Sequence, residues 1–218
     1  MENTSYSYLS REGNLASIAS LGRSVFFPSN TTIFEQGSAA KYLYIVGEGV
    51  IRISRHLQDG QRYVMAFLKK GDICGVPETG TYLNCACTLS PTQLFKVNVS
   101  VLEKRSSDHG ELFSELLLKT VTQIRIQQDR LIMTARCDVP TKVAMFLLDL
   151  CENFGCFCEK TGILTLPMPR SDIADYIGIA IESLSRALQV LTKQNVINRI
   201  DCRHLNIDVG RLRAAATP

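Results

Sequence analysis

Four polar side chains in the last third of the chain are spaced so that they share one face of a helix. They are Glu182, Ser185, Arg186 and Gln189, at positions i, i+3, i+4 and i+7. Arginine can donate two hydrogen bonds to guanine, glutamate can accept one from cytosine, and serine is short enough to contact a base without blocking approach. A solvated helix surface also explains such a stripe, so the neighbouring residues must decide between the two interpretations.

The residues around this stripe are typical of a helix-turn-helix. Ala174 is small where two helices would cross, and Gly178, four residues later, suits a turn that needs a positive φ. Six residues further on, Leu184 lies where the second helix buries an apolar side chain against the first. The apolar side of this second helix consists of Leu184, Ala187, Leu188 and Leu191. Because the second helix of the motif enters the major groove, we predict that the polar stripe recognises double-stranded DNA.

The predicted DNA-binding set includes the starts of both helices, through Arg170, Ser171 and Ile181. Arg186 is its most informative member. A surface pair between Glu182 and Arg186 is worth only a few tenths of a kcal/mol. One bidentate base contact, in comparison, discriminates by about 1–3 kcal/mol. Loss of Arg186 is therefore predicted to abolish specificity before it harms folding.

Composition limits what the rest of the chain can do. Its 218 residues are 45% hydrophobic and 21% charged, which indicates a folded protein of one or two domains. The net charge is +3, from 24 basic and 21 acidic residues, so the DNA prediction rests on the local motif and not on bulk charge. We expect neither a membrane-spanning run nor a secretory signal, and predict a soluble, cytoplasmic protein without a membrane partner.

Residues 1–105 are predicted to form an antiparallel β-barrel domain. Short alternating stretches are separated by glycine turns, including the hairpin signal Asp59-Gly60. The candidate strands are 42–46, 50–54, 61–68 and 94–97. Many short strands of this kind are typical of a small barrel or jelly roll. The predicted fold class is α+β, with this barrel preceding the helices.

Residues 106–137 are predicted to form one long dimerisation helix. The stretch 111–135 contains neither proline nor glycine. A stripe with alternating spacings of four and three, as in a two-stranded coiled coil, consists of Leu117, Val121, Ile124, Gln128 and Leu131. A glutamine at such a seam helps to fix register at some cost in stability. We expect a homodimer, and the alternative is a core helix of a monomer.

Residues 138–218 are predicted to form a winged helix-turn-helix DNA-binding domain. Pro140 disfavours helix at Val139 and suits the first turn of a new helix, so a hinge is expected at Asp138. Around the motif we expect a helix over 141–152, a strand over 163–166 and a hairpin over 196–207.

Eight cysteines are many for a chain expected in a reducing compartment, where they would be thiols, metal ligands or redox switches. Four of them fall in the last domain, at Cys151, Cys156, Cys158 and Cys202. Four thiolates can hold zinc or form a redox switch, but the Cys-x-x-Cys chelate is missing, and buried thiols are the favoured interpretation. Cys156 and Cys158 are the possible redox pair, because they are expected in an exposed loop.

The chain resembles the Crp/Fnr superfamily of transcription regulators from about residue 25 to 212. The order of barrel, long helix, hinge at Asp138 and winged helix-turn-helix carries the resemblance. The motif Glu182-x-x-Ser185-Arg186 is similar to the recognition helix of the Fnr and FixK branches. The resemblance implies a homodimeric activator that contacts RNA polymerase and binds a palindrome with TTGAT-like half-sites. Its two recognition helices would lie about 34 Å apart.

Departures from the family bear on what the barrel senses. Gly75 is followed by Val76, where cyclic-nucleotide-binding members have glutamate, and 81–87 lacks the arginine that cradles the phosphate. A buried phosphate without a cationic partner is costly, so cyclic AMP is not expected. No cysteine precedes Cys74, which argues against the N-terminal iron–sulfur cluster of Fnr. A further departure concerns the recognition helix. Ala180 stands where relatives place a capping Thr or Ser, and the missing cap costs roughly 1 kcal/mol of local stability.

The cysteines of the barrel leave a haem alternative open. Cys74 is one residue away from the haem-ligand position of a carbon-monoxide-sensing relative, without a histidine close behind it. Cys85 and Cys87 are expected on one face of a strand, as a thiol pair or, more simply, as small apolar filling. No cofactor is therefore expected, and haem and zinc remain the alternatives.

Two other protein classes fit the sequence less well. A cupin-like enzyme needs a His-x-His metal set, but His56, His109 and His204 are isolated, so no enzyme is predicted. A cyclic-nucleotide regulatory subunit needs the phosphate-binding arginine and has no use for a helix-turn-helix. Within the regulator class two variants stay open. One is independent of effectors and controlled by its own expression, and the other is a redox- or haem-dependent sensor that uses its cysteines.

Overall fold

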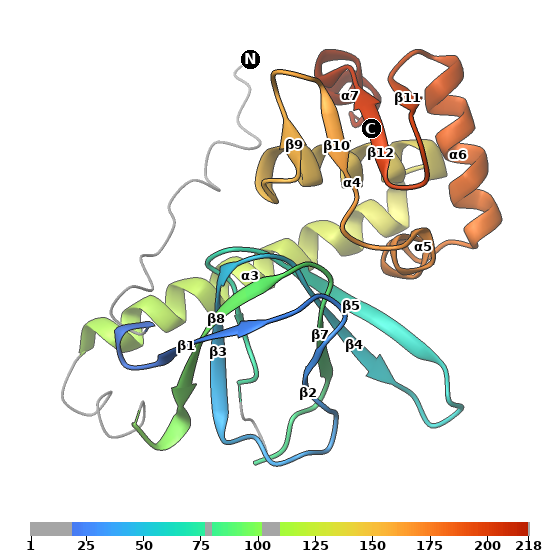
Figure 1. The fold of residues 1–218 in the computed structure, drawn as a ribbon. Helices are drawn as coiled ribbons and strands as arrows, with labels where there is room; N and C mark the ends of the chain where they lie inside the picture. The colour runs from blue at the N-terminus through green and yellow to red at the C-terminus, as the bar shows by residue number, and fades with distance from the viewer. Residues whose placement is uncertain (1–18, 77–79, 102–109, 218) are drawn as a thin grey trace.

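The computed structural model describes residues 19–76, 80–101 and 110–217, with the side chains of the long helix described from Leu117 onward. Figure 1 shows one long helix, α3, between a β-domain and a smaller C-terminal domain. No helix in these described stretches is both long and apolar enough to cross a membrane.

The β-domain is a jelly roll of two four-stranded antiparallel sheets (Figure 1). One sheet has the order β1 (Arg23–Phe27), β8 (Thr92–Asn98), β3 (Tyr42–Glu48) and β6 (Ile73–Cys74). The other has the order β2 (Thr32–Phe34), β7 (Cys85–Thr88), β4 (Ile51–His56) and β5 (Arg62–Leu68). The predicted antiparallel jelly roll is confirmed, as two separate sheets and not as one closed barrel. The hairpin signal Asp59-Gly60 lies between β4 and β5, with φ of +80° at Gly60.

Helix α3 (Gly110–Arg136) has 27 residues, which corresponds to a length of about 40 Å. It ends where the sequence predicts a break. The side chain of Asp138 accepts a hydrogen bond from the Thr141 backbone N–H at 2.9 Å and so caps helix α4 (Val139–Asn153). Pro140 lies in the first turn of α4, where its missing N–H costs nothing. Helix α4 therefore begins two residues before the predicted start at 141.

The C-terminal domain packs four helices against a small sheet (Figure 1). Its helices are α4, α5 (Arg170–Ile177), α6 (Ile181–Lys193) and α7 (Val209–Ala215). The sheet has the order β11 (Ile197–Arg199), β12 (His204–Ile207), β10 (Ile163–Thr165) and β9 (Phe157–Cys158). The predicted hairpin over 196–207 is confirmed as β11 and β12. Helix α7 was not predicted, and β9 lies where a loop was expected.

One apolar cluster contains residues of both domains. Leu147, Leu150, Leu164 and Leu205 form its centre in the C-terminal domain, each at most 1% exposed. Val64 and Phe67 of strand β5 belong to the same cluster, although they lie in the jelly roll. The helix-turn-helix is therefore held against the β-domain as well as within its own domain.

Candidate nucleic-acid interface

The turn between α5 and α6 has the geometry that the sequence predicts. Gly178 has φ of +76°, and its N–H donates to the carbonyl oxygens of Ala174 and Asp175. Ala174 is 3% exposed and Leu184 is 1% exposed, so both lie in the crossing of the two helices. Residues with a side chain rarely adopt this left-handed φ, which explains glycine at the turn.

Helix α6 has one buried side and one exposed side. Its buried residues are Leu184, Ala187, Leu188 and Leu191, as predicted. On the other side Glu182, Arg186 and Gln189 are exposed, and Ser185 is half-buried. The Arg186 guanidinium donates to Ser183 Oγ at 3.2 Å, so it is held by its own helix turn and not by Glu182. The predicted polar stripe is thus brought together on an open face.

The first turn of α6 lacks a side-chain cap. Ala180 occupies the N-cap position with φ of −67° and ψ of 147°, and its methyl group offers no acceptor. Next to it Ile181 is 45% exposed, which is compatible with its predicted place at the interface. An apolar side chain at this point can contact a thymine methyl group.

Arg170 and the wing form the second part of the candidate interface. Arg170 begins α5 half-buried, and its Nε is buried without a hydrogen-bond partner in the described part of the chain. Burial, and then the charge of Arg199 on β11, lower the pKa of the Arg170 guanidinium. Ser171 is exposed beside it. Sequence reasoning missed Arg199, because only the pairing of the hairpin brings it close to the start of α5.

An aspartate stabilises the turn at the tip of the wing. Asp201 accepts hydrogen bonds from the backbone N–H groups of Arg203 at 2.7 Å and His204 at 2.8 Å, and Oδ2 lies 2.8 Å from His204 Nδ1. These bonds favour the charged carboxylate and lower the pKa of Asp201 to about 2. The exposed Cys202 and Arg203 are presented by this turn.

The predicted seam of α3 is uncovered in the single chain. Leu117 is 52% exposed, Val121 49%, Ile124 53% and Leu131 70%, and Gln128 is also exposed. Leu118 and Ile132, each 62% exposed, widen the apolar strip beyond the predicted residues. Such a strip on a monomer is costly in water, and a second chain can bury it.

The interior of the jelly roll is filled by aromatic rings. Phe34 stacks against two tyrosines, with its ring centroid 4.0 Å from that of Tyr82 and 5.7 Å from that of Tyr44. All three are at most 8% exposed, and Tyr82 Oη donates to the Tyr42 carbonyl oxygen at 2.8 Å. A Cβ added to Gly75 would come within 3.0 Å of that same carbonyl oxygen. Gly75 is thus packed closely against Tyr82 and Tyr44 of the stack.

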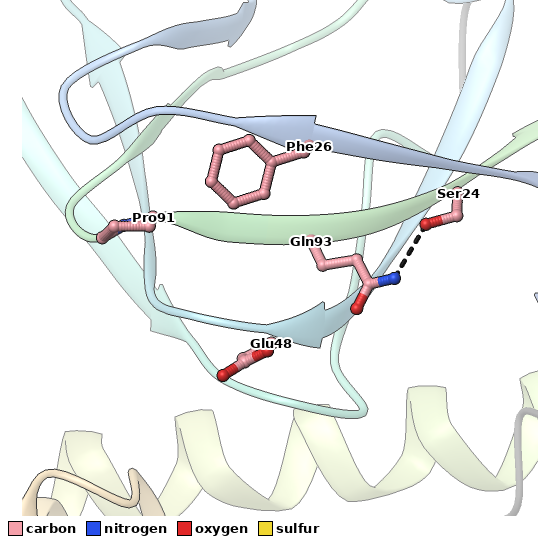
Figure 2. Close-up of a pocket in the computed structure, with 5 residues that line it drawn as sticks. All are labelled: Ser24, Phe26, Glu48, Pro91 and Gln93. Atoms are coloured by element: carbon pink, nitrogen blue, oxygen red, sulfur yellow. Dashed lines mark hydrogen bonds between the residues drawn. The ribbon is translucent and has the colours of Figure 1, made fainter.

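A shallow hollow of about 230 Å³ lies on the outside of the jelly roll (Figure 2). Its lining residues are Ser24, Phe26, Glu48, Pro91 and Gln93. Gln93 Nε2 donates to Ser24 Oγ at 2.8 Å, and the only charged group in the lining is the carboxylate of Glu48. The hollow therefore does not suit a phosphate ligand.

The cysteines differ in exposure. Cys158 and Cys202 are exposed, whereas Cys156 is half-buried and its pKa is raised by burial. Hydrogen bonds from Thr161 lower the pKa of Cys158. Burial raises the pKa of Cys74 to about 12, which keeps this thiol protonated. No group of three or more potential metal ligands occurs among the residues that the structure describes.

The segment around Phe157, expected to be a loop, is a short strand. Of the proposed redox pair, Cys156 and Cys158, only Cys158 is exposed. Their redox role stays a prediction. Cys85 and Cys87 are half-buried and alternate with the buried Ala86 and Thr88 along β7, so they share one face of the strand as predicted.

Comparison with protein families matches both domains. The cyclic nucleotide-binding domain matches residues 24–109, and the Crp-like helix-turn-helix domain matches residues 141–215. The nitrogen fixation regulation protein FixK of Azorhizobium caulinodans is 34% identical over 182 residues, 83% of this chain and 73% of that protein. The chain belongs to the Crp/Fnr family of transcription regulators. FixK of Rhizobium meliloti is also 34% identical, over 80% of this chain and 78% of its own length.

Solved structures of the Crp/Fnr family have the same fold. FixK2 from Bradyrhizobium japonicum superimposes with a TM-score of 0.79 at 27% identity, covering 90% of this chain and 98% of that one. A CRP-family regulator from Thermus thermophilus, TTHB099, gives a TM-score of 0.75 at 23% identity, over 88% and 96%. This chain is a Crp/Fnr-type DNA-binding transcription regulator, and α6 is the second helix of its helix-turn-helix.

Proposed function

We propose that this regulator is a homodimer that binds a palindrome with TTGAT-like half-sites, independently of cyclic AMP, and activates transcription through contact with RNA polymerase. It acts in the cytoplasm and catalyses no reaction. The observation that carries the proposal is the open polar side of α6, which rests on a fully buried apolar back. The resemblance of Glu182, Ser185 and Arg186 to the Fnr and FixK branches supports the half-site sequence.

Two further features support the mode of action. The exposed strip on α3 matches the spacing of a two-stranded coiled coil and would bring two copies of α6 to one duplex. The stack of Phe34, Tyr44 and Tyr82 occupies the interior of the jelly roll, and the hollow in Figure 2 has no cationic lining residue. Binding of cyclic AMP would need both space and a cation for its phosphate.

The test is selection of DNA from a random pool by the purified full-length protein, without any nucleotide. We expect a palindrome with TTGAT-like halves. Fluorescence anisotropy then compares this palindrome with a scrambled duplex at moderate salt, with and without cyclic AMP. Equal affinity for both duplexes would reject sequence-specific recognition, and a large gain from cyclic AMP would reject independence of the nucleotide. Transcription in vitro from a promoter with the selected site tests the contact with RNA polymerase.

A redox-controlled regulator is the second candidate, and the position of Cys202 favours it. This thiol is exposed in the wing and lies close enough to Arg170 to affect its pKa. Oxidation or alkylation there would add bulk or charge to the interface. Alkylation of the thiols and analysis of metal and haem content, each followed by the same anisotropy measurement, separate the candidates. Unchanged affinity after alkylation favours the redox-independent regulator.

A further inference from the structure

A buried carboxylate of the helix-turn-helix is bound by two arginines of the jelly roll. Asp172, on α5, is 1% exposed. Its Oδ2 accepts a hydrogen bond from Arg52 Nη1 at 2.6 Å, and its Oδ1 accepts one from Arg62 Nη2. Arg52 lies on β4 and Arg62 on β5, so the two neighbouring strands hold one carboxylate of a helix more than 100 residues away in the chain.

Two more contacts extend this interface. The Val64 backbone N–H donates to Asp175 Oδ2 at 2.9 Å, which connects β5 to the next turn of α5. Arg130 of α3 donates to the carbonyl oxygens of Met65 and Tyr176, and its guanidinium lies 4.0 Å from the centre of the Tyr176 ring. One arginine therefore joins the long helix, the jelly roll and α5.

The interface leaves the DNA-reading side of α6 free. Glu182, Arg186 and Gln189 are exposed. The hydrogen bonds from Arg52, Arg62 and Val64 reach α5, and the ring of Phe67 packs against Phe146 of α4. In Figure 1 the helix-turn-helix lies against the β4–β5 hairpin through α5, with α6 on the far side. The contact thus does not cover the recognition surface. Its geometric effect is to fix the direction of α6 relative to α3.

We propose that Asp172 is a positioning residue, whose clamp by Arg52 and Arg62 pre-sets the spacing of the two recognition helices in the dimer. This inference rests on the proposed function. The long helix is interrupted at Cys137-Asp138, so the direction of each helix-turn-helix relative to α3 depends on contacts such as those of α5 with the jelly roll. A palindrome requires both recognition helices at once, and binding of the second half-site is favoured when its direction is already fixed.

The experiment uses the full-length dimer with Asp172→Asn, which keeps the shape of the side chain and removes its charge. Affinity is measured for the palindrome, for a duplex with one half-site, and for palindromes with one base pair more or fewer between the halves. We expect about tenfold weaker binding of the palindrome, an unchanged affinity for the single half-site, and a weaker preference for the natural spacing. Damage to the fold of the helix-turn-helix would lower the half-site affinity as well.

Arg55→Gln is the matched control. Arg55 lies on β4 as Arg52 does, but its Nε donates to Asn84 Oδ1 at 2.9 Å within the jelly roll, so its loss removes a cation without releasing α5. Should Asp172→Asn fail to fold, Arg52→Gln and Arg62→Gln test the same clamp from the jelly roll.

Two outcomes would overturn the proposal. One is an unchanged ratio of palindrome to half-site affinity together with an unchanged spacing preference. The other is tighter binding of the palindrome by Asp172→Asn, which would make the clamp inhibitory. Failure of the proposed function is a separate result, because the unmodified protein would then not distinguish the palindrome from scrambled DNA.

Discussion

Helices α3 and α6 carry similar apolar stripes, but only one stripe is buried within the chain. On α6, Leu188 and Leu191 are 3% and 1% exposed, packed against the same core as α4 and α5. On α3, Ile124 and Leu131 are 53% and 70% exposed. An apolar stripe in a sequence indicates that a face favours burial, and not which molecule supplies the other surface. In α6 the partners belong to the same chain, and for α3 we infer a second copy.

The largest effect is expected from Val121→Glu, which places a carboxylate from each chain at the α3 seam. We expect monomers, and about 100-fold or weaker binding of the palindrome, because the two half-sites are no longer bound together. Sedimentation velocity measures the state of association, and anisotropy measures the affinity. Thr122→Glu, one residue away and off the seam, is the control. A Val121→Glu protein that still dimerises and binds DNA would contradict the assigned interface.

Two leucine truncations, one on each helix, test whether each apolar stripe is buried by its own chain or by a second chain. Leu188→Ala leaves a cavity in a core of one chain, and we expect a loss of about 2–5 kcal/mol in the free energy of unfolding. That loss should not vary with protein concentration. The loss caused by Leu131→Ala should be smaller and should depend on concentration, since it acts through the dimer. Denaturant unfolding at several concentrations measures both, and a concentration-independent loss for Leu131→Ala would count against the seam.

Arg186→Ala tests the exposed side of α6. We expect the free energy of specific binding to weaken by about 1–3 kcal/mol, or roughly 5- to 160-fold in affinity, while salt-dependent binding to random DNA persists. Thermal stability should hardly change, because Arg186 is exposed and bonds only to Ser183 within its own helix. Lys193→Ala, at the other end of the helix, controls for loss of a positive charge. Unchanged selectivity in Arg186→Ala would contradict the assignment of α6 as the helix that recognises bases.

Ala180→Ser supplies the cap that α6 lacks. The backbone of Ala180 is already extended, as an N-cap residue requires, so serine fits without rearrangement. We expect a gain of about 1 kcal/mol in the free energy of unfolding. The midpoint of denaturant unfolding measures it, with Ala180→Val as the control that adds no acceptor. Equal stability of Ala180→Ser and Ala180→Val would mean that the backbone N–H groups of this turn already have hydrogen-bond partners.

The smallest effect concerns the wing and its dependence on pH. The pKa of Asp201 is lowered to about 2, so its contribution to the order of the wing is present above its unfolded pKa of about 4 and is lost as the pH falls toward 2. NMR shifts of the Arg203 and His204 amides should follow this titration. Asp201→Asn should abolish it, and a titration that persists in this variant would belong to another group.

The sequence predicts those parts of the molecule that local rules determine. The positive φ at Gly178 and the break at Asp138 each follow from a few neighbouring residues, whereas the cap that Asp138 supplies to α4 is seen only in the structure. The buried and exposed sides of α6 follow from helical spacing. In these cases the physical cause lies within a few residues, so one sequence suffices to find it. The missing cap at Ala180, in comparison, is predicted from the resemblance to the Crp/Fnr superfamily.

Contacts between distant segments could not be predicted in this way. Asp172 reads as a polar residue in the first turn of a helix, and nothing near it indicates Arg52 or Arg62. Strand β9 exists because β10 supplies hydrogen-bond partners, while its own two residues have no strand pattern. The stacking of Phe34 against Tyr44 and Tyr82 likewise depends on three distant segments that meet in space.

Dimerisation through the exposed strip on α3, as proposed above, would make DNA binding depend steeply on the concentration of the chain. While most chains are single, mass action makes the concentration of pairs rise with the square of the total, so twice the protein gives about four times as many DNA-competent units. A modest fall in synthesis would then lower the occupancy of promoters more than it would for a regulator that binds DNA as a single chain. The exposed face of α3 would thus convert a gradual increase in protein concentration into a sharper threshold of gene regulation.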